Sequence, residues 1–268
     1  MLERSMASLL TAAKGLCIAT GLYRPARRLS RSLRRAELRE FQEDIVLYRS
    51  LLAPGALCFD IGANIGAKSE ALLHAGARVV AFEPNPLVVP ELRARCAYHA
   101  KWTLVQAALG SGVGVATLYA RQLHGQSGLK RDWEGEVTAE YSVPVVTLDA
   151  AIRCFGAPAY CKIDVEGWEL EVLKGLTQPV PLVSFEFHIS EQEVEKAKSC
   201  LDWLARFGPS QVNVTPSETA VFQLREWMPL QNFVDWFPGD LGRSVPGLWY
   251  GNIFVRSVDN DHRRGVPS

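Results

Sequence analysis

The sequence lacks the features by which several common classes of protein are recognised. Its 268 residues have a formal net charge of +0, with 29 Lys and Arg against 29 Asp and Glu. Because a balanced charge gives no overall attraction to phosphates, we expect no nucleic-acid partner. No apolar run is long enough to cross a membrane as a helix, since even the stretch Ser5–Tyr23 is interrupted by Lys14.

Patterns for disulfides, zinc and secretion are also missing. The six cysteines are scattered and none belongs to a Cys-x-x-Cys pair, which predicts a reduced protein without a zinc site. The N-terminus makes a poor secretory signal, because Glu3 lies in its charged region and Lys14 interrupts its apolar core. We therefore expect a cytoplasmic protein whose N-terminal stretch is a helix docked on the domain.

Two nucleotide-binding motifs are absent as well. No Gly-x-x-x-x-Gly-Lys-Ser/Thr sequence occurs, which argues against a loop that cradles phosphates. The dinucleotide pattern Gly-x-Gly-x-x-Gly is not matched either, because three residues separate Gly62 from Gly66 and no third glycine follows. The glycine spacing therefore disfavours a nicotinamide-dependent oxidoreductase.

What the sequence does contain is a strand, a tight turn and a helix start within residues 58–75. A short apolar run ends at Asp60, and two glycines follow before the helical stretch. This arrangement lets backbone approach a nucleotide-like ligand closely. About twenty residues further on, a second strand ends at Glu83, whose carboxylate can accept hydrogen bonds from both ribose hydroxyls. A ligand with an adenosine and an amino-acid tail, such as S-adenosylmethionine, fits this pattern; the alternative is a turn that binds nothing.

Strand-like and helix-like segments alternate from residue 57 onward. The predicted strands are Leu57–Asp60, Val79–Phe82, Thr103–Ala108, Tyr160–Asp164, Val183–His188, Gln211–Thr215 and Leu248–Arg256. The predicted helices are Lys68–His74, Val88–His99, a segment capped by Thr147 and ending at Phe155, Val165–Leu176, and Glu191–Phe207. Alternation of this kind predicts an α/β fold, a mostly parallel sheet with helices on both faces.

The chain is expected to have three parts: an N-terminal helical extension (1–52), one α/β domain (53–256) and a loose tail (257–268). Within the domain, Val113–Tyr119 follows a Gly-Ser-Gly turn and indicates a hairpin-like insertion, and Ser142–Val146 reads as a short strand. Between them, Gln122–Gly135 is polar and reads as a loop, in which Leu123–Gly128 could cover a ligand as a lid.

Arginines recur at three- and four-residue steps in the N-terminal extension, which places them on one helical face. They are Arg24, Arg27, Arg28, Arg31, Arg34 and Arg35. This face is either simply solvated or a basic surface for anionic lipid, acidic glycan or a partner.

Five segments taken together resemble the FkbM family of S-adenosylmethionine-dependent methyltransferases, which are class I and Rossmann-like. They are residues 59–66, 82–86, 107–110, 145–149 and 162–169, and the last, Lys-Ile-Asp-Val-Glu-Gly-Trp-Glu, is the family's most specific signature. The resemblance implies a seven-stranded sheet whose last strand, Leu248–Arg256, is antiparallel. It leaves out the N-terminal extension and the C-terminal part of the chain, which would decide the acceptor.

By position in these motifs, the resemblance also implies a site for S-adenosylmethionine. The turn after the first strand would line the methionine part of the cofactor through Asp60, Gly62, Ala63, Asn64 and Gly66. Glu83 would hold the ribose hydroxyls, with Pro84 and Asn85 beside the ribose or adenine. Ala107 would border the adenine through its backbone, and Gln106 could hydrogen-bond it.

The implied reaction is methyl transfer, usually to a hydroxyl oxygen of a sugar, a lipid-linked glycan or a secondary metabolite. An aliphatic hydroxyl must lose its proton, which requires a general base or a metal. Candidates lie at two adjacent strand ends: Asp164 and Glu166 at one, Glu186 and His188 at the other. Imidazole has a suitable pKa near ~6.5, although a purely structural histidine is an equal alternative.

Other roles stay open at this stage. Three carboxylates near a histidine could hold Mg²⁺, Lys162 is expected to make a structural ion pair, and Trp168 to pack in the core. The acceptor atom could be nitrogen or a carboxylate instead of a hydroxyl oxygen. A non-catalytic cofactor-binding or scaffold protein is disfavoured because all the acids of the motifs are present.

Overall fold

The computed structural model describes residues 14–20, 23, 35–133, 135–217, 219–244 and 248–258. Five of the six arginines of the basic face lie outside these residues, and Arg35 is the first residue of helix α3 (Arg35–Leu51). Most of the predicted tail, from residue 259, is likewise outside. The division into extension, domain and tail therefore stays a prediction.

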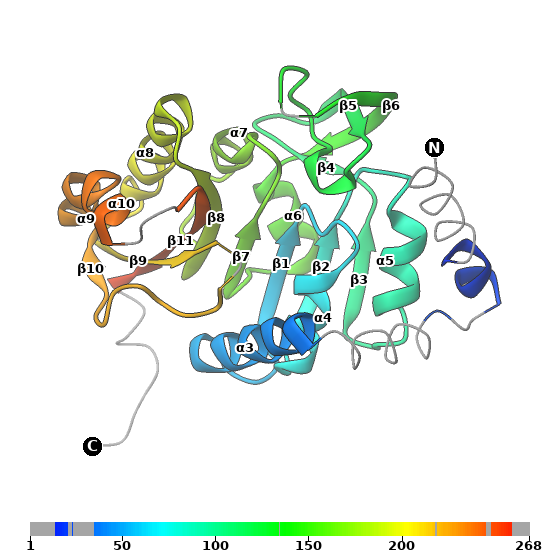
Figure 1. Ribbon diagram of the computed structural model, residues 1–268, viewed down its shortest axis with the longest axis horizontal. Coiled ribbons are helices and arrows are strands. Elements are labelled where there is room, and N and C mark those ends of the chain that lie inside the picture. The colour runs from blue at the N-terminus through cyan, green and yellow to red at the C-terminus, as the bar shows by residue number, and fades with distance from the viewer. Residues whose placement is uncertain are drawn as a thin grey trace.

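The centre of the molecule is one eight-stranded sheet in the order β10-β9-β11-β8-β7-β1-β2-β3 (Figure 1). Its strands are β1 Leu57–Ile61, β2 Arg78–Phe82, β3 Trp102–Val105, β7 Tyr160–Ile163, β8 Leu182–His188, β9 Ser210–Pro216, β10 Met228–Pro229 and β11 Tyr250–Ser257. The five strands from β3 to β8 are parallel, whereas β11 is antiparallel to both neighbours. The predicted Rossmann-like α/β fold and antiparallel last strand are confirmed. The sheet has eight strands rather than seven because the two-residue β10 pairs with the edge of β9.

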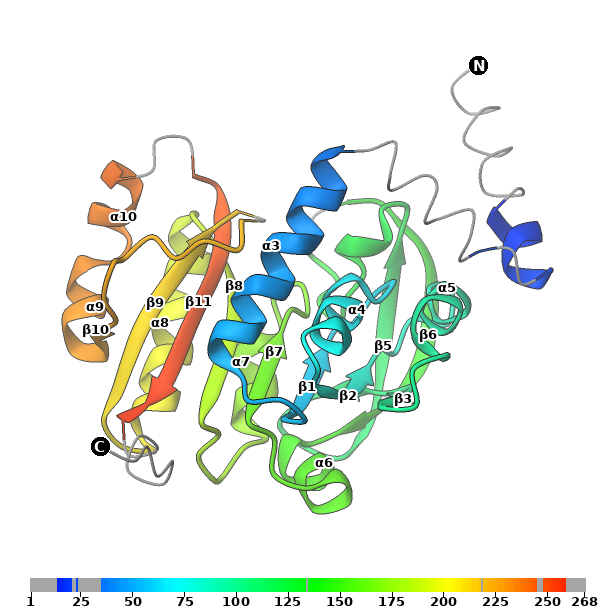
Figure 2. The ribbon, with the colours of Figure 1, turned by 90° about the horizontal axis from the view of Figure 1, so that it is seen from below.

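Helices cover both faces of this sheet, because successive side chains of a buried strand point to opposite sides. In β1, Phe59 and Ile61 belong to the core cluster beneath α6 (Leu148–Phe155), α7 (Glu169–Lys174) and α8 (Glu191–Ala205). Cys58 belongs to the opposite cluster, which packs against α3, α4 (Ala67–His74) and α5 (Val89–Cys96). Figure 2 shows α3 lying across this second face. Two short helices, α9 (Leu230–Trp236) and α10 (Gly239–Ser244), complete the first layer near β9.

A second sheet stands beyond the carboxyl ends of β1 and β2 (Figure 1). It has the order β4-β6-β5, with β4 Ala108–Leu109, β5 Gly114–Arg121 and β6 Val137–Val146. The antiparallel pairing of β5 with β6 confirms the predicted hairpin-like insertion, although both strands are longer than expected. The segment between them is a loop with one 3-10 turn, His124–Gln126, as the polar sequence predicts.

The first described residues of the N-terminal extension, before α3, touch the domain through α5. The ammonium of Lys14 pairs with Glu91, and the hydroxyl of Tyr23 donates to the same buried carboxylate. These contacts agree with the expected docking of the extension. No helix within the described ranges is long and apolar enough to cross a membrane.

Candidate active site

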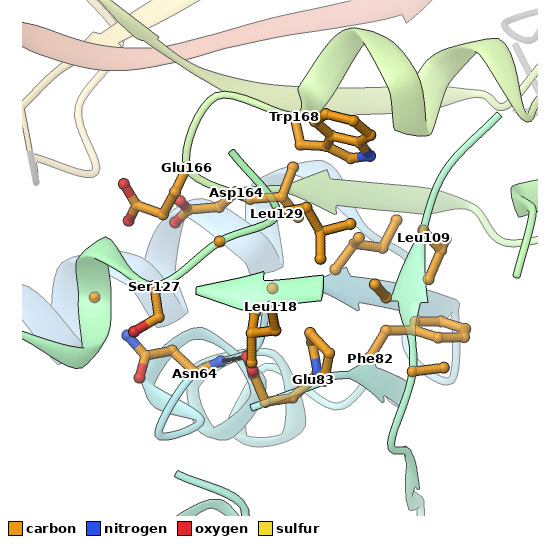
Figure 3. Close-up of a pocket in the computed structure, with 18 of the residues that line it drawn as sticks. Asn64, Phe82, Glu83, Leu109, Leu118, Ser127, Leu129, Asp164, Glu166 and Trp168 are labelled. Carbon is orange, nitrogen blue, oxygen red and sulfur yellow. Dashed lines mark hydrogen bonds between the residues drawn. The ribbon is translucent and has the colours of Figure 1, made fainter. Parts of the chain in front are cut away.

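The site is a cavity of about 270 Å³, far larger than two other cavities of about 20 Å³ each among the described residues. It opens at the carboxyl ends of β1, β2, β7 and β8, where open α/β sheets bind ligands, and the small sheet and the loop after β5 cover it (Figure 3). Its lining includes Gly62, Asn64, Glu83, Pro84, Ala107, Leu118, Ser127, Leu129, Asp164, Glu166, Trp168 and Glu186.

The glycine turn after β1 serves two different packing needs. Gly62 has φ +80°, and a Cβ there would lie 1.8 Å from the carbonyl oxygen of Asp164, so only glycine lets the ends of β1 and β7 meet. Gly66 has φ +81°, but a Cβ there would meet the side chain of Leu92 on α5 at 2.6 Å. Gly66 therefore serves helix packing and, like Ala63, does not line the cavity.

Glu83 is the central fixed side chain at the β2 end of the cavity. It is 6% exposed, and one carboxylate oxygen accepts the backbone N–H group of Asn64 at 2.7 Å (Figure 3). The other carboxylate oxygen accepts the backbone N–H group of Asn85 at 2.8 Å. Burial raises the pKa of Glu83 to about 7, against the lowering effect of these two hydrogen bonds. Each oxygen keeps a lone pair that can accept a ligand hydroxyl.

The remaining predicted cofactor residues divide into those at the cavity and those behind it. Pro84 and Ala107 line it. Asp60 is fully buried behind the cavity wall. One of its carboxylate oxygens accepts a hydrogen bond from Ser69 Oγ at 2.6 Å, the other has no hydrogen-bond partner among the described residues, and burial raises the pKa of Asp60. Asn85 is buried and accepts the N–H of Leu87 at 3.0 Å, while Gln106 is exposed and outside the lining. Of these five residues, Pro84 and Ala107 line the cavity, whereas Asp60, Asn85 and Gln106 do not.

The segment after β7 is a turn and not the helix that the sequence predicts from Val165. Glu166 and Gly167 have φ +54° and +90°, and α7 begins only at Glu169. The carboxylate of Glu169 accepts the N–H groups of Val165 at 3.3 Å and Gly167 at 3.1 Å. Because a side chain takes these backbone donors, the predicted first turn of helix is wrong.

Three carboxylates meet at the β7 and β8 end of the cavity. Asp164, Glu166 and Glu186 each offer an oxygen within 4.8 Å of the others. Burial, and then the charges of the other two, raise the pKa of Glu166 to about 9; burial and Asp164 raise the pKa of Glu186 to about 7. Lys162 lies 2.8 Å from Asp164, which confirms the expected ion pair. Carboxylate oxygens suit Mg²⁺, so these residues fit such an ion in donor type.

His188 reaches this cluster only through Glu186. Its Nε2 lies 3.3 Å from Glu186 Oε2, and this hydrogen bond raises the pKa of the imidazole. The ring is half-buried between Tyr250 and Trp133, at centroid distances of 5.9 and 5.5 Å, and does not line the cavity. Trp168 does line it while also packing on the core, which agrees with the packing role expected from the sequence.

The loop after β5 is held by a residue that the sequence analysis missed. Arg121 is 3% exposed, and its guanidinium donates to backbone carbonyls along the loop. The acceptors are the carbonyl oxygens of Tyr119, Gln126, Lys130, Arg131, Trp133 and Gly135, at 2.9–3.4 Å. Gly125, Ser127, Gly128 and Leu129 of this loop border the cavity, as expected for a lid. The available sequence signal was an arginine that ends an otherwise apolar strand.

Fold and site together define a class I, S-adenosylmethionine-dependent methyltransferase domain. Comparison of sequences narrows this class: residues 60–229 match the family described as the Methyltransferase FkbM domain. The chain belongs to the FkbM methyltransferase family.

Among characterised relatives, the chain is similar to the hexuronic acid methyltransferase AglP of Haloferax volcanii, with 30% identity over 152 residues. The match covers 55% of this chain and 56% of AglP, so the chain spans little more than half the length of that relative.

Solved structures give more distant likenesses. One is precorrin-6Y C5,15-methyltransferase of Geobacter metallireducens, with a TM-score of 0.41, 12% identity, and coverage of 80% of this chain and 88% of that one. Another is TYW2 of P. horikoshii in complex with MeSAdo, with a TM-score of 0.42, 12% identity, and coverage of 80% and 61%. Similarity at this level carries no argument about activity.

Proposed function

We propose that this protein transfers a methyl group from S-adenosylmethionine to a hydroxyl oxygen of a sugar or glycan acceptor. The observation that carries the proposal is one cavity with two different ends. At one end Glu83 and the turn after β1 offer hydrogen-bonding groups, and at the other three carboxylates converge.

The first end suits the nucleoside. The carboxylate of Glu83 would accept the ribose hydroxyls, the backbone beside Ala107 would border the adenine, and Gly62 and Asn64 would face the amino-acid tail. The side-chain oxygen Asn64 Oδ1 is buried without a hydrogen-bond partner in the described residues, which suits a donor from a ligand. When bound, the cofactor supplies an electrophilic methyl group on a good leaving group.

The second end suits removal of the acceptor proton. In the transfer the S–CH₃ bond breaks and an O–CH₃ bond forms, while the hydroxyl proton must go to a base. Glu186 lines the cavity with a pKa near about 7, close to the optimum for a general base at neutral pH. His188, hydrogen-bonded to Glu186, can pass the proton outward. Asp164, Glu166 and Glu186 would also be the residues that hold Mg²⁺ if the reaction uses it.

A sugar is the favoured acceptor because AglP is named as a hexuronic acid methyltransferase and matches this chain at 30% identity. A small molecule, a free glycan or a lipid-linked glycan could each present such a hydroxyl. Transfer to a carboxylate is the competing outcome, and it yields an ester that alkali cleaves, whereas a methyl ether survives.

The test is calorimetric titration with S-adenosylhomocysteine, with NAD as the control, on the wild type, Glu83→Ala and Asp164→Ala. Loss of two hydrogen bonds to a charged group at about 1.5 kcal/mol each predicts roughly 100-fold weaker binding in Glu83→Ala. Asp164→Ala should reduce turnover far more than binding, with radiolabelled methyl transfer to 4-nitrophenyl glycosides, including the glucuronide, as the assay. Equal losses of binding in both variants would contradict this division of roles, and preference for NAD would contradict the cofactor.

A further inference from the structure

The indole of Trp133 is attached to the turn that carries Glu166. Its Nε1 donates to Glu166 Oε2 at 2.8 Å, across 33 residues of sequence. A Cβ on Gly167 would lie 2.7 Å from the ring, so the indole packs directly on the backbone of this turn. Trp133 therefore contacts both the carboxyl group and the backbone that orients it.

Charged side chains of α8 and the loop hold the indole in this place. The ammonium groups of Lys130 and Lys196 lie over the ring, 5.3 and 5.1 Å from its centroid, as in cation–π contacts. Lys196 is 3.0 Å from Glu169 Oε2, and both lysines pair with Glu193. Since Glu169 also holds the turn after β7, the loop, the turn and α8 form one connected network.

Glu166 needs such a support because its surroundings oppose it. It lies in the left-handed backbone region, and the carboxyl groups of Asp164 and Glu186 each have an oxygen within 4.8 Å of its own. Among the described residues, the indole N–H of Trp133 is the one hydrogen-bond donor that reaches the Glu166 side chain. The same loop borders the cavity through Ser127 and Gly128, so its position and that of Glu166 are linked.

We propose that Trp133 is a positioning residue, which fixes the Glu166 carboxyl group at the acceptor end of the cavity when the loop covers the cofactor. This inference rests on the proposed function. It assigns to the loop a part in assembling the site beyond excluding water, because opening of the loop would withdraw the donor from Glu166.

The experiment compares Trp133→Phe, which keeps a ring and removes the N–H, with Trp203→Phe. Trp203 is the matched control, because its buried Nε1 has no hydrogen-bond partner in the described residues. With an acceptor from the glycoside panel, Trp133→Phe should lower kcat about tenfold and leave the affinity for S-adenosylhomocysteine within about threefold, as expected for loss of one hydrogen bond. Trp203→Phe should change neither, and equal kcat in the two variants overturns the proposal.

A second readout needs no acceptor. In ¹⁵N–¹H spectra, the Trp133 indole resonance is the one that disappears in Trp133→Phe. It should shift in Glu166→Gln and on addition of S-adenosylhomocysteine, while the Trp203 resonance stays in place. Binding of S-adenosylhomocysteine without a shift at Trp133 overturns the positioning role alone. Absence of binding to the folded wild type overturns the proposed function instead, and with it the basis of this inference.

Discussion

The two ends of the cavity are built differently. At the β1–β2 end, Glu83 is fixed by backbone N–H groups only 19 and 2 residues away. At the β7–β8 end, Glu166 is fixed by an indole 33 residues away, and three carboxylates crowd together. The first end is held by local backbone geometry, whereas the second depends on contacts between distant segments. In the proposed function, the end that binds the cofactor is therefore held locally, whereas the end that does the chemistry is assembled only by the complete fold.

The largest effect on stability should come from a substitution where β1 and β7, which carry the two ends of the cavity, meet. In Gly62→Ala the new Cβ would overlap the carbonyl oxygen of Asp164, and we expect a loss of more than about 3 kcal/mol in the free energy of unfolding. Gly55→Ala is the matched control, since Gly55 has nearly the same φ, +81°, with nothing within 4 Å of the added Cβ. It should lose only about 1–2 kcal/mol. Equal losses in urea denaturation would show that backbone strain, and not the contact between β1 and β7, makes Gly62 necessary.

A smaller loss in the free energy of unfolding should follow from removing the positive charge of Lys162, which lies between the two ends. Lys162→Met leaves Asp164 and the buried Asp60 without this neutralising charge. We expect the free energy of unfolding to fall by about 2–3 kcal/mol. The loss is limited because the Asp164 side chain is 31% exposed and partly solvated. Lys174→Met removes an ion pair with Glu171 between half-exposed side chains and should lose less than about 1 kcal/mol. Equal changes in the two variants would mean that Lys162 is dispensable for the charge balance of the site.

The two ends of the cavity should also contribute differently to the pH dependence of stability. A carboxyl group whose pKa is raised by folding binds its proton more tightly in the native state, so the unliganded protein loses stability as pH rises from about 4.5 toward the raised pKa. For Glu83 and Glu186 that loss is complete near pH 7, whereas for Glu166 it continues to about 9. Each group contributes at most about 1.4 kcal/mol per pH unit.

Glu166→Gln should therefore flatten the fall in melting temperature between pH 7 and 9, while leaving a fall below pH 7. Glu195→Gln, at an exposed position on α8, serves as the control. A profile between pH 7 and 9 that is as steep in Glu166→Gln as in the wild type would show that Glu166 is not the group that titrates there.

The smallest effect is expected from Gln106, which the sequence placed at the adenine. Its side chain is exposed and outside the cavity, whereas the neighbouring Ala107 lines it. Gln106→Ala should change the calorimetric Kd for S-adenosylhomocysteine by less than about twofold, since substitution of an exposed side chain outside the cavity contributes little. A tenfold loss of affinity would show that the cofactor contacts residues outside the described cavity.

The comparison also explains which features could be predicted. Alternating apolar segments predicted the parallel sheet and its covering helices, because burial on two faces requires that pattern. The position of Glu83 at the end of β2 followed from a short motif, and its role at the cofactor stays a prediction. The turn at Glu166 was predicted as helix, since the sequence does not reveal that the carboxylate of Glu169 takes the backbone N–H groups. Trp133 could not be assigned either, because its partner lies in another segment.

The way Arg121 holds its loop has a consequence for how this protein can change. The Arg121 guanidinium donates hydrogen bonds to backbone carbonyl oxygens, and every amino acid has a backbone carbonyl whatever its side chain. Residues such as Gln126 and Arg131 can therefore be exchanged without altering the path of the chain that Arg121 secures. A loop fastened in this way tolerates variation: apart from Trp133 and Lys130, which contact each other and reach Glu166 through the indole, its side chains can be exchanged while the backbone keeps its path.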